Sequence, residues 1–221
     1  YIKHFTKDGK LTAYQFNDGG RSGFINTAKK FTPTPENIAH KRDLYETPAL
    51  PDNTLEKFFA YIEGLYGQVL EKKILQKRPL SKKDHEIVAM YVSILENRTP
   101  TQQAHLNKFI TSLEDKGRRL SFAHNAPDAA ERWSQQMEEV KKHFFAQWLA
   151  TTIEINKWGV LDFCFLEPAS FVSEAEFITA DHPVSLIDYT SDNNPYGKNQ
   201  WHKTAECVVP LTPKLALFGN N

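Results

Sequence analysis

The spacing of apolar residues divides the chain into three parts. Between residues 53 and 158, apolar residues recur every three or four positions, which is the period of an amphipathic α-helix. On either side, short apolar runs alternate with polar residues and end at turn-forming glycine or asparagine, as β-strands do. The order of strands, helices and strands predicts an α+β fold. We expect a small antiparallel or mixed sheet built from both chain ends, with a four-helix insert at about residues 53–158.

The first two helices of the insert have clear ends. The first is expected to begin at Asn53 or Thr54 and to end before Lys77-Arg78-Pro79, because proline cannot continue a helix. The second follows Ser81, which has Asp84 at the spacing of a capping box. Its residues are apolar on most sides, so this helix is expected to be central and buried.

The second half of the insert is less sharply marked. Thr99-Pro100 either breaks the second helix or begins a third. Residues 116–125 are expected to form a loop, and a long helix follows from Pro127 to about Gly159. The residues expected on the inner face of the third helix are Leu106, Phe109, Ile110 and Leu113.

Strands are expected on both sides of the insert. In the first part, residues 11–16 alternate apolar and polar, and residues 22–26 are the expected return strand. The expected strands of the last part are 160–166, 176–179, 184–187, 207–209 and 215–218. We therefore expect one α+β domain spanning 1–221, with a β-hairpin region at 1–50, the helical insert at 53–158 and a β region at 160–221.

The charge balance and the apolar runs exclude some partners. Lysine plus arginine equals aspartate plus glutamate, at 27 each, so no overall field attracts nucleic acid, and a nucleic-acid partner would need a local basic patch. No apolar run reaches the ~18 residues of a membrane span. Cys164 and Cys207 each lie in an apolar run. Free buried thiols in neighbouring strands are favoured over a disulfide, which favours a cytoplasmic location.

The strongest local candidate for chemistry is Asp181-His182, which precedes Pro183. The run Phe177-Ile178 before it is typical of a buried strand, whose end would present an acid and an imidazole at a rigid turn. Such a pair is able to bind a divalent ion or to move a proton. The alternative is an aspartate that caps the turn beside an incidental histidine. The sequence contains no zinc, phosphate-loop, dinucleotide or serine-nucleophile signature.

Three other places carry charge where a core does not require it. Arg42-Asp43 either ties the first part of the chain to the insert or lines a site. Glu63 lies between Ile62 and Gly64 on the first helix and is either solvated or paired. Arg98 ends the second helix, where it either interacts with the last carbonyl groups or binds a carboxylate or phosphate.

Several segments, taken in order, resemble the mainly bacterial family known as domain of unknown function 4238. Residues 1–6 resemble the end of the family's leading histidine motif, so the start of that motif is expected to be missing from this chain. Members usually continue past the segment that 210–213 resembles, so the C-terminal end is expected to be short as well. His182 stands where the family usually has asparagine. The other segments that carry the resemblance are 11–14, 35–39, 42–45, Ile62-Glu63-Gly64, Arg98-Thr99-Pro100, 178–184 and 210–213.

The resemblance implies a set of polar residues rather than an activity: Arg42, Asp43, Glu63, Arg98 and Asp181. If these converge, Asp181, Asp43 and Glu63 would hold a divalent metal, Mg²⁺ or Mn²⁺, and the two arginines would hold the phosphate of a small molecule or a nucleic acid. That arrangement would make a metal-dependent hydrolase or nuclease, with His182 as a further candidate. The alternative is a non-enzymatic ligand-sensing or protein-interaction domain, in which the same charges form a structural ion-pair network that joins Arg98 to Glu63 or Asp43.

Overall fold

A computed structural model of the chain describes residues 5–15, 29–34, 50, 53–124, 126–158, 162–167, 175–180, 182–188 and 205–220. The first part contains strands β1 (Ala13–Gln15) and β2 (Lys29–Phe31). The helices are α1 (Thr54–Val69), α2 (Lys82–Asn97), α3 (Pro100–Ala123) and α4 (Pro127–Trp158), and α1 continues into a π-helical turn at Leu70–Ile74. The last strands are β3 (Asp162–Leu166), β4 (Ser185–Asp188), β5 (Ala205–Thr212) and β6 (Leu215–Asn220).

This order confirms the α+β class and the four-helix insert. The strands of each chain end form a sheet of their own. β1 pairs with β2, while the strands after the insert form an antiparallel sheet in the order β3-β6-β5-β4. The register of the larger sheet places Cys207 opposite Leu186 on one side of β5 and opposite Gly219 on the other.

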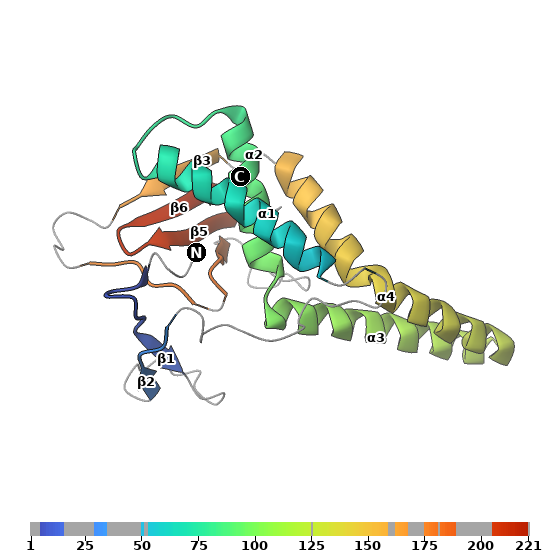
Figure 1. Ribbon diagram of the computed structural model, residues 1–221. Coiled ribbons are helices and arrows are strands. Elements are labelled where there is room, and N and C mark those ends of the chain that lie inside the picture. The colour runs from blue at the N-terminus through green and yellow to red at the C-terminus, as the bar shows by residue number, and fades with distance from the viewer. Residues whose placement is uncertain are drawn as a thin grey trace.

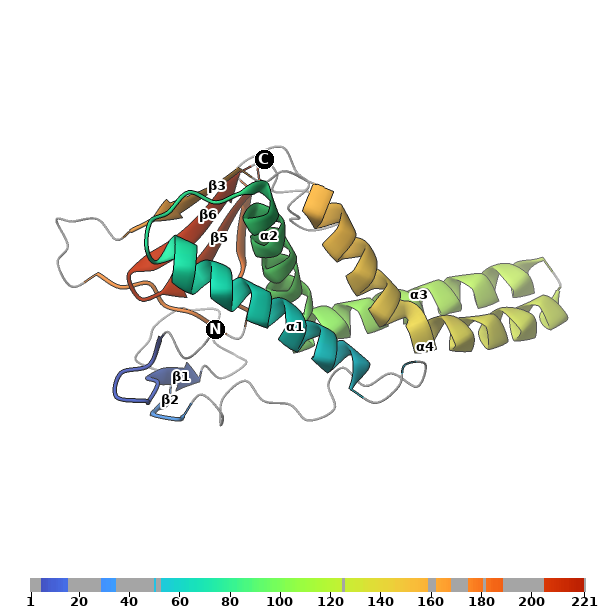
Figure 2. The ribbon, with the colours of Figure 1, turned by 45° about the horizontal axis from the view of Figure 1, so that its top comes forward.

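The core lies between the larger sheet and the helices. Along β5 the side chains of Cys207, Val209 and Leu211 are buried in alternation with half-buried neighbours, as expected for a strand with one covered face. Helices α1 and α2 lie over that face, and α4 packs beside α2 (Figures 1 and 2). At the contact between α1 and α2, the rings of Tyr66 and Tyr91 are stacked with centroids 3.8 Å apart. Burial of α2 on most sides confirms that it is the central helix.

The helix boundaries follow local signals in the sequence. The Ser81 side chain accepts a hydrogen bond from the Asp84 backbone, and the Asp84 carboxylate accepts one from the Ser81 backbone, so the capping box is confirmed. Lys77 adopts a left-handed conformation, with φ 52°, where the first helical segment ends. Asn53 stands at the start of α1 with φ 58°, and its side chain makes no capping hydrogen bond there.

The expected loop at residues 116–125 is wrong, because α3 continues to Ala123. The glycine in this stretch, Gly117, is a packing requirement rather than a turn. A Cβ atom at Gly117 would lie 2.1 Å from the indole nitrogen of Trp133 on α4, so only glycine lets that ring lie against α3. The indole nitrogen donates a hydrogen bond to the Glu114 backbone oxygen at 3.2 Å.

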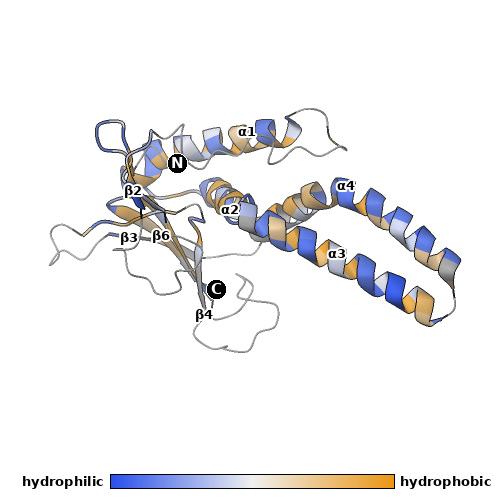
Figure 3. Ribbon diagram, turned by 90° about the horizontal axis from the view of Figure 1, so that it is seen from below, coloured by the Kyte–Doolittle hydropathy of each residue, from blue (hydrophilic) through white to orange (hydrophobic). Residues whose placement is uncertain are grey.

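The expected inner face of α3 is half right. Leu106 and Ile110 are buried, whereas Phe109 and Leu113 are exposed. The reason is that α3 and α4 form a hairpin that projects away from the sheet (Figure 3). In the described part of the chain, α4 is the main element that covers α3, so α3 buries a narrow strip of residues and not a broad face.

The expected strand at residues 176–179 is also wrong. Residues 175–180 form neither a helix nor a strand, and Ile178 is 84% exposed. The Phe177 backbone N–H donates to the Pro213 oxygen at 2.8 Å, which holds the segment beside the β5–β6 turn. The expected return strand at 22–26 lies outside the described residues, and β1 pairs instead with β2.

Cys164 and Cys207 are both free thiols. Cys207 is buried as expected, but Cys164 is exposed, so the expectation that both thiols are buried is wrong. They lie on β3 and β5, which are separated by β6. Among the residues that the structure describes, no helix is both long enough and apolar enough to cross a membrane.

Candidate functional site: the polar end of helix α2

Four consecutive polar residues, Glu96-Asn97-Arg98-Thr99, follow the apolar body of α2. Arg98, Asn97 and Thr99 make contacts with α1, α4 and α3. The charge of Glu96 acts on Cys207 of the larger sheet. The four therefore join α2 to α1, α3, α4 and the larger sheet at one place.

Arg98 and Glu63 are the two predicted site residues that the structure brings together. Arg98 stands at the C-cap of α2, and its Nη1 atom donates to the Glu63 Oε1 atom on α1 in a close ion pair. The Arg98 side chain is 32% exposed and the Glu63 side chain 40% exposed, so the pair lies at the edge of the core. A pair with this exposure contributes little to the stability of the fold, and it joins α1 to the end of α2.

Asn97 links the same helix end to α4. Its side chain is buried, and its Nδ2 atom donates to the Ser93 oxygen at 2.8 Å. Its Oδ1 atom accepts a hydrogen bond from the Trp148 indole at 3.1 Å. The amide thus satisfies a backbone oxygen and fixes an indole ring at the α2–α4 contact.

Thr99 begins the next helix. The sequence left open whether Thr99-Pro100 ends the second helix or begins a third. In the structure the dipeptide follows the end of α2 and begins α3. The Thr99 side chain accepts from the Gln102 backbone at 3.1 Å, and Pro100 occupies the first turn of α3. Thr99 is buried, so α3 leaves the core from a fixed point.

Glu96 is the residue of this group that sequence reasoning missed. The residue as a whole is half-buried, but its Oε2 atom is shut off from solvent and has no hydrogen-bond partner in the described part of the chain. Because the carboxyl end is the buried end, its desolvation raises the pKa of Glu96 from 4.5 to about 7. The signal was available in the sequence. Val88, Val92 and Glu96 recur every four positions, so the acid continues a buried row of the helix.

Glu96 lies close enough to the sheet to affect Cys207. Burial, with the negative charge of Glu96 as a second cause, raises the pKa of the Cys207 thiol to about 12. The thiol is therefore protonated at neutral pH, which is the inert state of a buried cysteine. A neutral thiol on β5 and a desolvated carboxyl group on α2 therefore lie near each other, between the helix and the sheet.

The segment around His182 does not follow a buried strand, although the sequence predicted one. The His182 ring is exposed, and its Nδ1 atom lies 3.0 Å from the Val184 backbone oxygen, to which it donates in the matching tautomer. Pro183 and Val184 are buried and anchor the turn. Asp181, Arg42 and Asp43 lie outside the described residues. Of the three expected metal ligands, only Glu63 is described, and no group of three or more His, Cys, Asp or Glu suited to a metal ion occurs within the described ranges.

The family model described as protein of unknown function DUF4238 matches residues 1–221, the whole length of the chain. No curated protein and no solved structure matches this chain.

Proposed function

The chain belongs to the DUF4238 family, and we propose that it is a ligand-sensing or protein-interaction domain in which the Glu63–Arg98 pair is a structural contact. The observation that carries the proposal is the direct ion pair between α1 and the end of α2. The guanidinium group of Arg98 is bound by the carboxylate of Glu63, which is the contact that the ion-pair alternative predicted.

The position of the pair suggests how sensing would work. Glu63 belongs to α1, while Arg98 stands where α2 ends and α3 begins. An anion that binds Arg98, or a cation that binds Glu63, would separate α1 from this junction. Both side chains keep enough exposure for a ligand to reach them. The neighbouring Asn97 contact would pass the change to α4 through Trp148.

A double-mutant cycle tests the structural contact. Glu63→Gln, Arg98→Gln and the double variant are compared with the unmodified chain by chemical denaturation. We expect a coupling free energy of about 0.5–1 kcal/mol, because the pair is partly shielded from solvent. The control pair is Lys77 and Glu167, whose side chains are 77% and 55% exposed and whose coupling should be near zero. Equal coupling in the two pairs would contradict the proposal.

A second candidate function is a metal-dependent phosphodiesterase or nuclease. It is favoured by the exposed edges of Glu63 and Arg98, which leave a carboxylate and a guanidinium group open to one ligand. Asp181 and Asp43 would complete the ligands of Mg²⁺ or Mn²⁺, and Arg42 would join Arg98 on the phosphate. His182 would lie beside this site. Binding of Mn²⁺ that depends on Asp181 is the observation that would favour this candidate over the first.

The location belongs to the same proposal. Two free cysteines fit a reducing compartment, so we place the protein in the cytoplasm of a bacterial cell.

A further inference from the structure

The α3–α4 hairpin projects away from the sheet and from α1 (Figures 1 and 2). Its two helices pack on each other through a strip of buried residues that includes Leu106, Ile110, Ala130 and Met137. Both helices carry hydrophobic and hydrophilic residues around this strip (Figure 3). The two sides of the hairpin differ in character.

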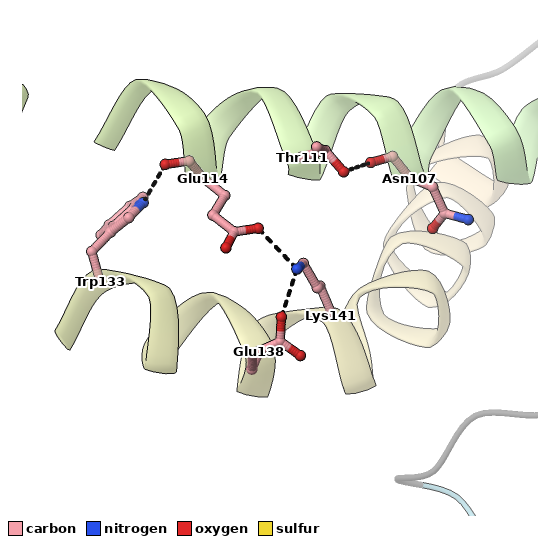
Figure 4. A network of polar contacts seen from close by, with 6 residues as sticks. All are labelled: Asn107, Thr111, Glu114, Trp133, Glu138 and Lys141. Carbon is pink, nitrogen blue, oxygen red and sulfur yellow. Dashed lines mark hydrogen bonds and ion pairs between the residues drawn. The ribbon is translucent and has the colours of Figure 1, made fainter. Parts of the chain in front are cut away.

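One side is polar and internally bonded. Lys141 on α4 pairs with Glu114 on α3 at 2.8 Å and with Glu138 at 2.7 Å (Figure 4). The Thr111 hydroxyl donates to the Asn107 oxygen at 2.9 Å on the same side of α3. A surface of this kind is expected to face solvent.

The other side is an apolar face, formed by Phe109 and Leu113 on α3 and by Val140, Phe144 and Trp148 on α4. Phe109 lies two positions before Thr111 on α3, and Val140 lies two positions after Glu138 on α4. Two positions correspond to a rotation of about 200° around the helix axis, so Phe109 and Val140 point away from the polar side. Within each helix these residues are spaced four apart, so they form two rows. Phe144 connects the rows, with its ring centroid 6.3 Å from those of both Phe109 and Trp148.

The exposed area of the apolar face is comparable with the largest apolar patch of a typical monomer, and such patches are often functional. The exposed fractions are 52% for Phe109, 37% for Leu113, 42% for Val140 and 37% for Trp148. With about 150–250 Å² for each large side chain, roughly 300–400 Å² of apolar surface remains open. A stable interface buries about 800 Å² on each side, of which about 60% is apolar. The face therefore supplies most of the apolar area that one side of a stable dimer needs.

We propose that the apolar face binds the same face of a second copy of this chain, so that two hairpins form a four-helix bundle. Trp148 is suited to be an anchor contact at the α2 end of this face, because the hydrogen bond from its indole to Asn97 already fixes its ring. This proposal concerns a different surface from the Glu63–Arg98 pair and does not rest on it.

The apolar face has both a basic and an acidic residue at its edges. This favours a second copy of the chain over a partner whose surface is mainly acidic or mainly basic. Exposed Lys116 follows Leu113 by three positions on α3. Exposed Glu139, which pairs with Lys142 on the same helix, precedes Val140 on α4. Because Glu114 pairs with Lys141 across the antiparallel hairpin, Lys116 and Glu139 lie at the same level on the two helices. When two hairpins pack in parallel about a two-fold axis, α3 of one copy lies on α4 of the other. Each Lys116 then meets Glu139 of the second copy, which makes the edges self-complementary.

The test is the molar mass of the full chain in solution, measured by analytical ultracentrifugation over a wide range of concentrations. We expect a dimer. The double variant Leu113→Glu with Val140→Glu should weaken the dimer at least ~100-fold, because it buries four like charges between the two faces. The matched control is Thr111→Glu on the polar side of α3, which should leave the dimer unchanged. Circular dichroism of each variant establishes that the helices are retained.

A second pair of variants tests the parallel arrangement. Lys116→Glu alone and Glu139→Lys alone should each weaken the dimer, and the two together should restore it. A chain that is monomeric at every concentration would overturn the proposal, even if it binds some other protein. A dimer that survives the Leu113→Glu and Val140→Glu changes would overturn it too. Failure of the paired charge reversal to restore the dimer would overturn the parallel arrangement.

Discussion

At the scale of single residues, Glu96 is the most unusual group in the described part of the chain. Its carboxyl oxygen is removed from water beside β5 without a hydrogen bond in return, and its pKa of about 7 reflects that cost. The folded chain holds the proton of Glu96 over a pH range in which the unfolded chain has lost it. The carboxyl therefore contributes its full stability below its ordinary pKa of 4.5, and this contribution is lost as the pH rises towards 7.

Replacing Glu96 by glutamine should remove this pH dependence. Between about pH 4.5 and pH 7 the unmodified chain should lose up to about 3 kcal/mol of unfolding free energy through this one group. Glu96→Gln should be flatter over the same range and more stable than the unmodified chain at pH 8. Urea denaturation at a series of pH values measures both effects. Glu131→Gln, at an exposed position of α4, is the control and should follow the unmodified chain.

At the scale of elements, the hairpin of α3 and α4 depends on one close approach. The Trp133 ring lies against the backbone of Gly117, and its indole donates to the Glu114 oxygen. Sequence periodicity predicted α4 and the start of α3, because each carries a regular apolar row. It failed at residues 116–125, because a glycine in a polar stretch has the same appearance in a loop and at a tight helix contact. Only the position of Trp133 on the partner helix distinguishes the two.

A comparison of two glycines measures the cost of that contact. Gly117→Ala should lower the unfolding free energy by about 1–3 kcal/mol, because the new methyl group overlaps the Trp133 ring. Gly64→Ala on α1 should instead raise the unfolding free energy by about 0.5–1 kcal/mol, because a Cβ atom there meets nothing within 4 Å and alanine favours the helix. Thermal or urea denaturation gives both values. A stabilised Gly117→Ala variant would show that the ring does not occupy the space beside α3.

At the scale of the molecule, the helical insert covers one face of the larger sheet and carries the Glu63–Arg98 pair within it. The α+β class, the four helices and the strands at the positions of β5 and β6 were predictable, because each follows from a local period or a cap. The separate β1–β2 sheet was not, since sequence does not show which strands pair over long distances. For the site, the resemblance singled out Glu63 and Arg98, whose contact is confirmed. Glu96 was missed, because an acid near a helix end is usually solvated and the buried row of Val88 and Val92 before it is the one sign of its burial.

The central claim is that Glu63 and Arg98 serve each other and not a metal ion. The most direct test is a calorimetric titration of Mn²⁺ into the full chain and into its Glu63→Gln and Asp181→Ala variants, with Glu131→Ala as a control for an exposed carboxylate. The account predicts the same weak heats from all four proteins. Saturable binding that is lost in both Glu63→Gln and Asp181→Ala but kept in the control would contradict it, and would instead support a metal-dependent phosphodiesterase or nuclease.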